Sequence, residues 1–113
     1  MDLTISTRVL PTCTVVQVAG EVDLSTEPEL RRDLAAVVER EMAQVVVDLT
    51  GVAFLDSTGL GLLVWAFRRM QDRGGGLCLA GPQASVAKLL DLTSLDRLIT
   101  VYDSVEAATE AIR

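Results

Sequence analysis

The feature that most restricts the fold of this chain is a short apolar run at residues 45–49, Val-Val-Val-Asp-Leu. A strand with apolar residues on both faces has to be covered on both faces, as happens in a parallel sheet flanked by helices. Residues 77–80, Leu-Cys-Leu-Ala, form a second run of this kind. The two runs therefore predict an α/β protein whose sheet lies in the interior.

The segments around these runs complete the pattern. Residues 3–10 and 14–19 predict a hairpin with its turn around Pro11, because they alternate in polarity or are β-branched. About four helices and one last short strand are expected: helices following Thr26, at about 58–72, at about 84–92 and from Ser104 to Ile112, and the strand at 98–102.

Strands that alternate with helices after an initial hairpin predict a small α/β sandwich. Its sheet is expected to be mixed but mostly parallel, with about five strands. A chain of 113 residues fits one domain, residues 1–113.

Side chains at the helix starts suggest how the helices are capped. Thr26, with Glu29 three residues later, fits a capping box, and Pro28 is tolerated in a first turn. Ser57 and Ser104 fall where an N-cap residue is expected. The helix after Thr26 is predicted to bury one face made of Leu30, Leu34, Val37 and Val38.

The composition excludes several classes of function. The chain has 10 basic and 16 acidic residues, a net charge of −6 and a pI near 4.5. These charges repel phosphate backbones, so nucleic acid is not expected as a partner. The chain has no histidine, which removes Ser-His-Asp and Cys-His catalysis and histidine-ligated metal sites. Asp23, Asp48 and Asp56 lack the spacing of a metal site, and no phosphate-binding loop motif is present. We therefore expect no catalytic residue, no metal and no cofactor.

The sequence also bears on location. No apolar run approaches the roughly 20 residues of a membrane span, and the N-terminus lacks the basic and apolar regions of a secretory signal. We expect no direct membrane insertion and a cytoplasmic location. Cys13 and Cys78 lie in apolar stretches and are expected to be buried, reduced thiols.

Residues 56–61, Asp-Ser-Thr-Gly-Leu-Gly, are the strongest candidate for a functional site. One reading of Ser57 is that it only caps the helix that follows. The other is that it accepts a phosphoryl group, because a helix N-terminus with free N–H groups tolerates an anion well. Position alone leaves both readings open.

The helix at about 58–72 carries a second candidate. Its core stripe is predicted to contain Leu60, Leu63, Val64, Phe67 and Met70. Leu62 and Trp65 project on the opposite side, near Gly61 and two arginines. A tryptophan flanked by arginine is typical of an anchor at a protein–protein interface. The alternative is that another helix or the hairpin covers Trp65.

Several segments together resemble the STAS domain family, and within it the stand-alone anti-sigma factor antagonists of bacteria. The segments that carry this resemblance are residues 20–23 (Gly-Glu-Val-Asp), 46–49, 52–61 and 85–92, with Leu95 and Ile99. They span nearly the whole chain. The resemblance implies a partner-switching regulator and not an enzyme.

The resemblance also implies roles for individual residues. The unphosphorylated protein would bind an anti-sigma factor, which would release a sigma factor. That anti-sigma factor would also be a serine kinase that phosphorylates Ser57 and so ends binding, and a serine phosphatase would reverse the modification. The partner-binding residues would be Asp23, Asp56, Thr58, Gly59, Leu60 and Gly61, to which we add Leu62 and Trp65 as the anchor described above. Thr58 is a minor alternative acceptor.

Two other functions are considered. A STAS domain can be an accessory subunit of a membrane transport system that is never phosphorylated; the intact Asp56-Ser57 pair argues against this. A small nucleotide-binding or enzymatic α/β domain would need a phosphate loop or a pair of titratable catalytic groups, which the sequence lacks.

Overall fold

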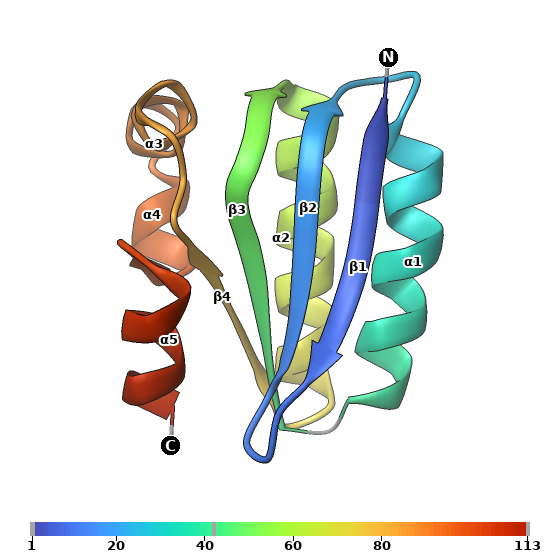
Figure 1. The fold of residues 1–113 in the computed structure, drawn as a ribbon, viewed down its shortest axis with the longest axis vertical. Helices are drawn as coiled ribbons and strands as arrows, with labels where there is room; N and C mark the ends of the chain where they lie inside the picture. The colour runs from blue at the N-terminus through green and yellow to red at the C-terminus, as the bar shows by residue number, and fades with distance from the viewer. Residues whose placement is uncertain (1, 42, 113) are drawn as a thin grey trace.

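The computed structural model describes residues 2–41 and 43–112 (Figure 1). Its elements in chain order are β1 (Leu3–Val9), β2 (Thr14–Val22), α1 (Glu27–Arg40), β3 (Gln44–Leu55), α2 (Ser57–Asp72), β4 (Gly76–Ala80), α3 (Ala84–Leu92), α4 (Leu95–Leu98), β5 (Val101–Tyr102) and α5 (Val105–Ile112). One sheet contains the strands in the order β1-β2-β3-β4-β5, with β1 antiparallel to β2 and the other neighbours parallel. The predicted α/β class, hairpin and mixed sheet are confirmed.

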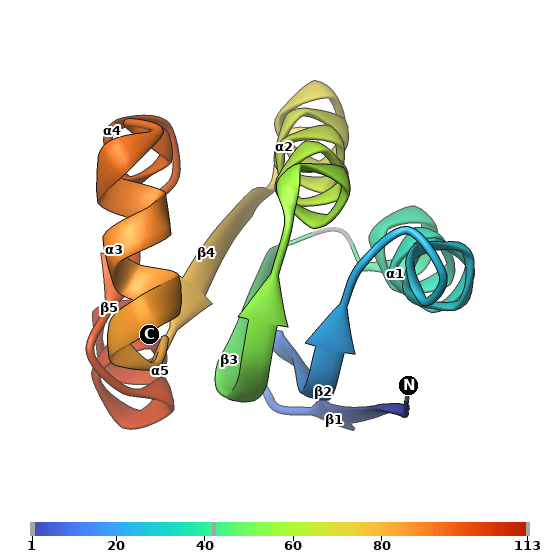
Figure 2. The same ribbon diagram turned by 90° about the horizontal axis from the view of Figure 1, so that it is seen from above.

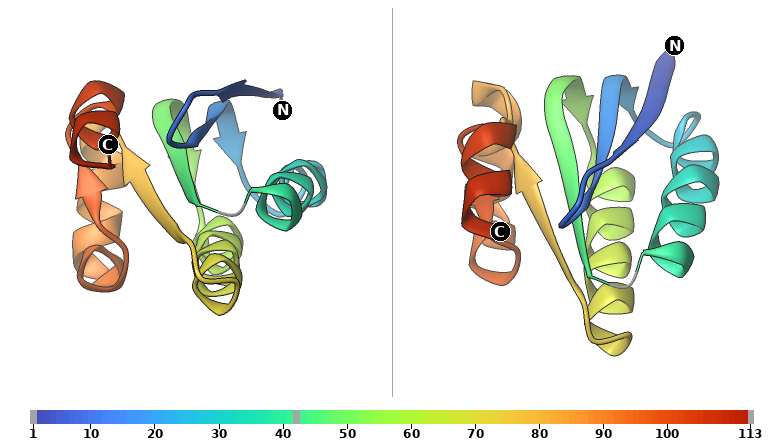
Figure 3. Two further views of the ribbon diagram at one scale, coloured as in Figure 1. Left: turned by 90° about the horizontal axis from the view of Figure 1, so that it is seen from below. Right: turned by 60° about the horizontal axis from the view of Figure 1, so that its bottom comes forward.

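Helices cover both faces of the central strands. Helices α1 and α2 lie side by side on one face (Figure 2), and α5 packs against the other face of β3 and β4 (Figure 3). On β3, Val45 and Val47 belong to the larger core, whereas Val46 belongs to the smaller core under α5. The apolar run is thus covered on both faces, as predicted. Among the described residues, no helix combines the length and apolar character that crossing a membrane requires.

Strand β3 is longer than the apolar run that predicts it. Its pairing with β4 ends at Asp48, whereas its pairing with β2 continues to Leu55 through two irregularities in register. The second irregularity lies near Ala53, and both Ala53 and Phe54 are exposed there instead of alternating between the faces. The extension carries the chain to the edge of the sheet where the candidate site lies.

The start of α1 differs from the prediction. Thr26 makes no side-chain cap bond to the helix, so the predicted capping box is wrong. Its hydroxyl instead donates to the Glu21 carbonyl oxygen at 2.8 Å and accepts from the Asp23 N–H at 3.0 Å, which ties together the loop before the helix. The predicted cap at Ser104 is confirmed, because its hydroxyl oxygen accepts from the Ala107 N–H at 3.0 Å. The predicted buried face of α1 is also confirmed: Leu30, Leu34, Val37 and Val38.

The strand predicted at 98–102 is wrong in its first part. Residues Leu95–Leu98 form α4, closed by a bond from the Ile99 N–H to the Leu95 carbonyl oxygen at 2.9 Å, and only Val101–Tyr102 form β5. Ser94, with φ of 58°, turns the chain between α3 and α4. A short apolar segment has the same pattern in a helical turn and in a strand, so periodicity could not separate the two. The described chain therefore has five helices.

Both cysteines are free and buried, as expected. They lie in the smaller core under α5. Burial, with a smaller contribution from Cys13, raises the pKa of the Cys78 thiol to about 11. The Cys78 thiol therefore stays protonated at neutral pH and packs as a small apolar side chain.

Candidate functional site

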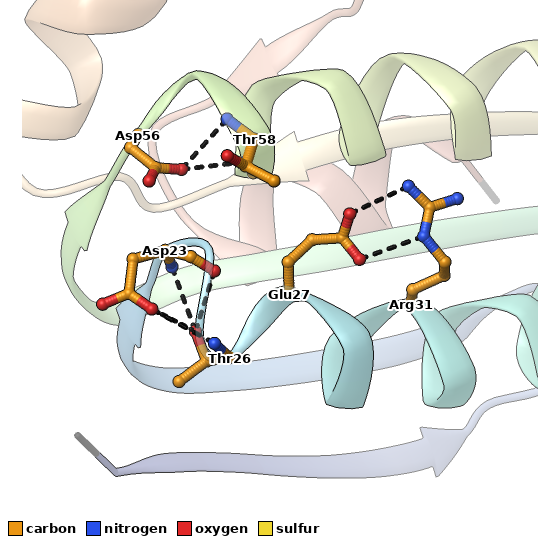
Figure 4. Close-up of polar contacts among 7 residues, drawn as sticks. Asp23, Thr26, Glu27, Arg31, Asp56 and Thr58 are labelled. Atoms are coloured by element: carbon orange, nitrogen blue, oxygen red, sulfur yellow. Dashed lines mark hydrogen bonds and ion pairs between the residues drawn. The ribbon is translucent and has the colours of Figure 1, made fainter.

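The candidate site lies where β2 and β3 end. The strands are parallel neighbours, and Val22 of β2 pairs with Leu55 of β3. The Asp56 N–H donates to the Val22 carbonyl oxygen at 3.2 Å and so continues this pairing by one residue. Because parallel strands end at the same edge, the loops that contain Asp23 and Asp56 lie next to each other (Figure 4).

Asp56, and not Ser57, is the N-cap of α2. Its Oδ1 accepts from the Thr58 N–H at 3.0 Å and from the Gly59 N–H at 3.2 Å (Figure 4). Of the two readings of Ser57, the one in which it caps the helix is therefore wrong. Aspartate at this position also places a negative charge at the positive end of the helix dipole, which is favourable.

Ser57 is the first residue of α2, and its side chain is exposed. Within the described part of the chain, its hydroxyl makes no hydrogen bond, because the capping role has gone to Asp56. The hydroxyl can therefore be modified without breaking an internal contact. The structure thus removes the competing explanation for a serine at this position.

The loop before α1 holds Asp23 in one orientation. Asp23 Oδ1 accepts from the Ser25 hydroxyl at 2.6 Å, from the Ser25 N–H at 2.9 Å and from the Thr26 N–H at 3.1 Å. These bonds, that of the Ser25 hydroxyl most of all, hold the pKa of Asp23 below its ordinary value of 3.8. The same hydrogen bonds hold this ionised, half-buried carboxylate in place in the loop next to the start of α2 (Figure 4).

The two glycines of the motif have different reasons to be glycine. A Cβ on Gly59 would overlap Leu55 Cδ1 and lie 2.7 Å from Val22 Cγ1, so these two buried side chains would have to shift to admit it. A Cβ on Gly61 would have nothing within 4 Å, and Gly61 is exposed. Packing therefore favours glycine at position 59 and places no such demand on position 61.

The two hydrophobic residues predicted to face outward on α2 are not alike. Leu62 has no exposed surface and belongs to the larger core, so its predicted outward position is wrong. The α2 helix touches β4 on one side and α1 on the other, so its buried stripe is wider than expected. Leu60 is also buried, as predicted.

Trp65 lies between α1 and α2 and is half-buried. The Arg31 guanidinium lies 5.8 Å from the centre of the Trp65 ring. Arg31 in turn donates to both carboxylate oxygens of Glu27, at 3.0 and 2.9 Å (Figure 4). Part of the ring is thus covered by α1, and part remains accessible to a partner.

Two exposed hydrophobic residues near the site were not predicted. Leu24 is 76% exposed in the loop after Asp23, and Phe54 is 47% exposed at the end of β3. Phe54 lines a groove of about 210 Å³ between β3 and α3, together with Ala53, Leu55, Ser85, Val86 and Leu89. The sequence signal for Leu24 was available, since it is an apolar residue between polar neighbours in a loop. That for Phe54 was not, because its exposure depends on the irregular pairing of β3.

The candidate site is a surface at the end of the sheet. It presents one exposed hydroxyl, two fixed carboxylates and several apolar groups at one end of the molecule. Among residues 2–41 and 43–112, no group of three or more acidic or cysteine side chains is placed to hold a metal ion. A hollow of about 820 Å³ lies elsewhere, between strands β1, β2 and β3 and the residues that lead into α5.

The chain is similar in sequence to known proteins. A family model described as "STAS domain" matches residues 4–108. The anti-sigma-B factor antagonist of Staphylococcus epidermidis is 33% identical over 106 residues, which cover 94% of this chain and 98% of the relative.

Two solved structures are similar in fold. An anti-sigma factor antagonist from Mycobacterium paratuberculosis has a TM-score of 0.92 and 28% identity, covering 99% of this chain and 95% of that chain. The Bacillus cell fate determinant SpoIIAA in its phosphorylated form has a TM-score of 0.74 and 19% identity, covering 97% of this chain and all (100%) of that chain.

Proposed function

Because this chain belongs to the STAS domain family, we propose that its function as an anti-sigma factor antagonist works by partner switching at Ser57. The antagonist function itself is supported by the names of its relatives and of the similar structures. In the proposed mechanism, the unphosphorylated protein binds an anti-sigma factor in the cytoplasm and a sigma factor is released. The anti-sigma factor, acting as a serine kinase, phosphorylates Ser57 and the complex dissociates.

The single observation that carries this proposal is that Ser57 is exposed while Asp56 caps the helix. An acceptor hydroxyl has to be free and accessible, and its modification should not unfold the domain. A phosphoryl group at the first residue of α2 would lie beside the N–H end of a 16-residue helix, where negative charge is best tolerated. Phosphorylation would therefore change the surface and leave the fold in place.

The proposed contact surface is centred on Ser57. Asp56 precedes it and Asp23 lies in the neighbouring loop; hydrogen bonds hold both carboxylates in place, and Leu24 adds an exposed apolar group. Gly61, one turn further along α2, leaves room for the partner's backbone to approach closely. Gly59, Leu60 and half-buried Thr58 are proposed to shape this helix start.

The charge of the phosphate gives the switch its energy. A phosphoserine carries about −1.5 to −2 charges at neutral pH. Placed in an interface already bordered by the carboxylates of Asp23 and Asp56, it adds repulsion and a desolvation cost that an unmodified hydroxyl does not have. A change of about 3 kcal/mol corresponds to roughly a hundredfold in affinity, which is enough to exchange partners.

In this mechanism the protein is the substrate of a kinase and of a serine phosphatase, and it is not itself an enzyme. The exposed hydroxyl of Ser57 is accessible to both. Thr58 is a poorer acceptor, because it is half-buried and its N–H is held by Asp56.

The test is to incubate the protein with each anti-sigma factor of the ATP-dependent serine kinase type encoded in its own genome. We expect one of them to bind the unmodified protein and, with ATP, to place a phosphate on Ser57. Ser85→Ala is a matched control, since Ser85 is also an exposed serine in the first turn of a helix. Phosphorylation that persists in Ser57→Ala and is lost in Ser85→Ala would overturn the assignment.

A further inference from the structure

The charges of this protein are unevenly distributed between its layers. Residues 27–40 and 57–73, which contain α1 and α2, hold six of the ten basic residues but only five of the sixteen acidic ones. These two segments carry a net charge of +1, and the remainder of the chain carries −7. Since α1 and α2 lie side by side on one face (Figure 2), that face differs in charge from the rest of the molecule.

A stripe of residues along α2 connects this face with Ser57. Ser57, Gly61, Trp65 and Arg68 are spaced by four, four and three residues, which places them on one side of the helix. Ser57, Gly61 and Arg68 are exposed, and Trp65 is half-buried. The stripe begins with the acceptor hydroxyl and ends with a cation about three turns away.

Three arginines of α1 and α2 differ in whether a carboxylate neutralises them. Arg69 is paired with Glu39, at 2.7 Å from Nε to Oε1. Arg31 is paired with Glu27 but remains 48% exposed, with its guanidinium near Trp65. Arg68 forms no ion pair within the part of the chain that the structure describes. Arg31 therefore lies near Trp65, Arg68 follows Trp65 by three residues on the same side of α2, and both arginines are exposed.

We propose that the α1–α2 face binds an acidic segment of the anti-sigma factor. Trp65 is the apolar anchor of this contact, and Arg68 and Arg31 are the cations that pair with the carboxylates of the acidic segment. The inference rests on the proposed function and identifies a second contact for the same partner. The remainder of the chain carries −7 and repels an acidic segment, so the approach of such a segment is most favourable over α1 and α2. Tryptophan and arginine are the residue types that contribute most at protein interfaces.

This contact differs in role from the contact at Ser57. The Ser57 end presents the carboxylates of Asp23 and Asp56, so it favours a cationic region of the partner. The α1–α2 face favours an anionic region. A partner therefore needs both regions in the right order to bind well, and this requirement selects one anti-sigma factor over others.

The experiment compares Arg68→Glu with Lys88→Glu in binding to the anti-sigma factor that captures the wild-type protein. The two substitutions change the net charge equally, but Lys88 is an exposed residue of α3, outside the α1–α2 face. We expect Arg68→Glu to weaken binding about tenfold, mainly by slower association, and Lys88→Glu to change it less than twofold. Asp72→Asn, which removes an exposed carboxylate four residues after Arg68, should tighten binding two- to threefold.

The outcomes separate the two proposals. If no anti-sigma factor binds the wild-type protein, the proposed function fails and this inference fails with it. If the wild-type protein binds and Arg68→Glu weakens binding no more than Lys88→Glu, only this inference is overturned. The wild-type protein and both variants are also mixed with vesicles of anionic phosphatidylglycerol. Binding of the wild-type protein to vesicles, lost in Arg68→Glu, would assign the face to a lipid surface and overturn the inference as well.

Discussion

The backbone of Asp56 is bonded to the backbone of Val22, with 3.2 Å between the Asp56 nitrogen and the Val22 oxygen. This bond joins the end of β3 to the end of β2 immediately before the candidate site. It fixes the Asp56 cap, and through it Ser57, relative to the loop that holds Asp23. The positions of these residues are therefore set by the sheet, although all three lie just outside its strands.

Substitutions of Ser57 should separate binding from modification. Ser57→Ala should bind the anti-sigma factor as well as the wild-type protein and should not be phosphorylated. Ser57→Asp should bind less tightly than the wild-type protein but more tightly than the phosphorylated protein, because one carboxylate has a smaller charge than a phosphate. Calorimetric titration of the three proteins checks this. Equal affinity for Ser57→Asp and wild type would contradict the electrostatic account.

Asp56 should be important for stability through its cap. Asp56→Ala removes the acceptor of two N–H groups and should lower the free energy of unfolding by about 1 kcal/mol. Asp56→Asn keeps an acceptor oxygen and should lower the free energy of unfolding by only a few tenths of a kcal/mol. Urea unfolding measures both variants. Ser57→Ala is the control, and a loss as large as that of Asp56→Ala would mean that Ser57 contributes to the cap.

The two glycines of the motif should respond in opposite directions to the same change. Gly59→Ala places a Cβ against Leu55 Cδ1 and Val22 Cγ1 and should destabilise the protein by about 1–3 kcal/mol through overpacking. Gly61→Ala meets no atom and should stabilise it by up to about 1 kcal/mol through higher helix propensity. Thermal unfolding compares the two. If Gly61→Ala also weakens anti-sigma factor binding, the close approach proposed there is supported; unchanged binding would remove Gly61 from the contact surface.

Leu62 and Trp65 should affect different measurements. Leu62→Ala removes a fully buried side chain and should cost about 2–5 kcal/mol of stability. Trp65→Ala should weaken binding by tenfold or more, in a protein that still folds. Urea unfolding and binding are measured for both. Trp65→Ala with unchanged affinity would exclude the ring from the interface.

Stability should be highest between about pH 5 and pH 9. Hydrogen bonds from Ser25 lower the pKa of Asp23, and Arg69 lowers that of Glu39, so the stability they contribute is lost as pH falls through these lowered values. The pKa of Cys78 is raised from 9.0 to about 11, so above pH 9 the unfolded chain ionises first and stability falls as pH rises. Thermal midpoints across pH measure both limbs. Cys78→Val should flatten the alkaline limb, and an unchanged slope would show that other groups cause it.

Much of the fold follows from local sequence. The apolar run at 45–49 predicts a strand covered on both faces, and the structure divides its residues between two cores. The buried face of α1 follows from helical spacing alone. Such patterns are readable because burial is periodic along a regular element. These patterns did not predict α4, because a single helical turn is too short for a period to appear.

The residues of the candidate site were identified from the sequence, but their roles were not all assigned correctly. The motif at 56–61 indicated the segment of the candidate site, because polar side chains between a strand and a helix are typical of a helix cap or a functional group. Which side chain caps the helix depends on whether its oxygen reaches the N–H groups of the first turn. That distance is fixed by the path of the chain, and it selects Asp56 over Ser57.

The sequence by itself determined the α/β class, the order of the elements other than α4, the hairpin and the segment that carries the site. Tertiary structure decided the rest: the cap at Asp56, the burial of Leu62, the exposure of Phe54 and the approach of Arg31 to Trp65. The physical reason is the range of the interactions. Polarity patterns and turn residues act over a few positions along the chain, whereas burial and ion pairing depend on elements far apart in sequence, which meet only when β2, β3, α1 and α2 have packed together.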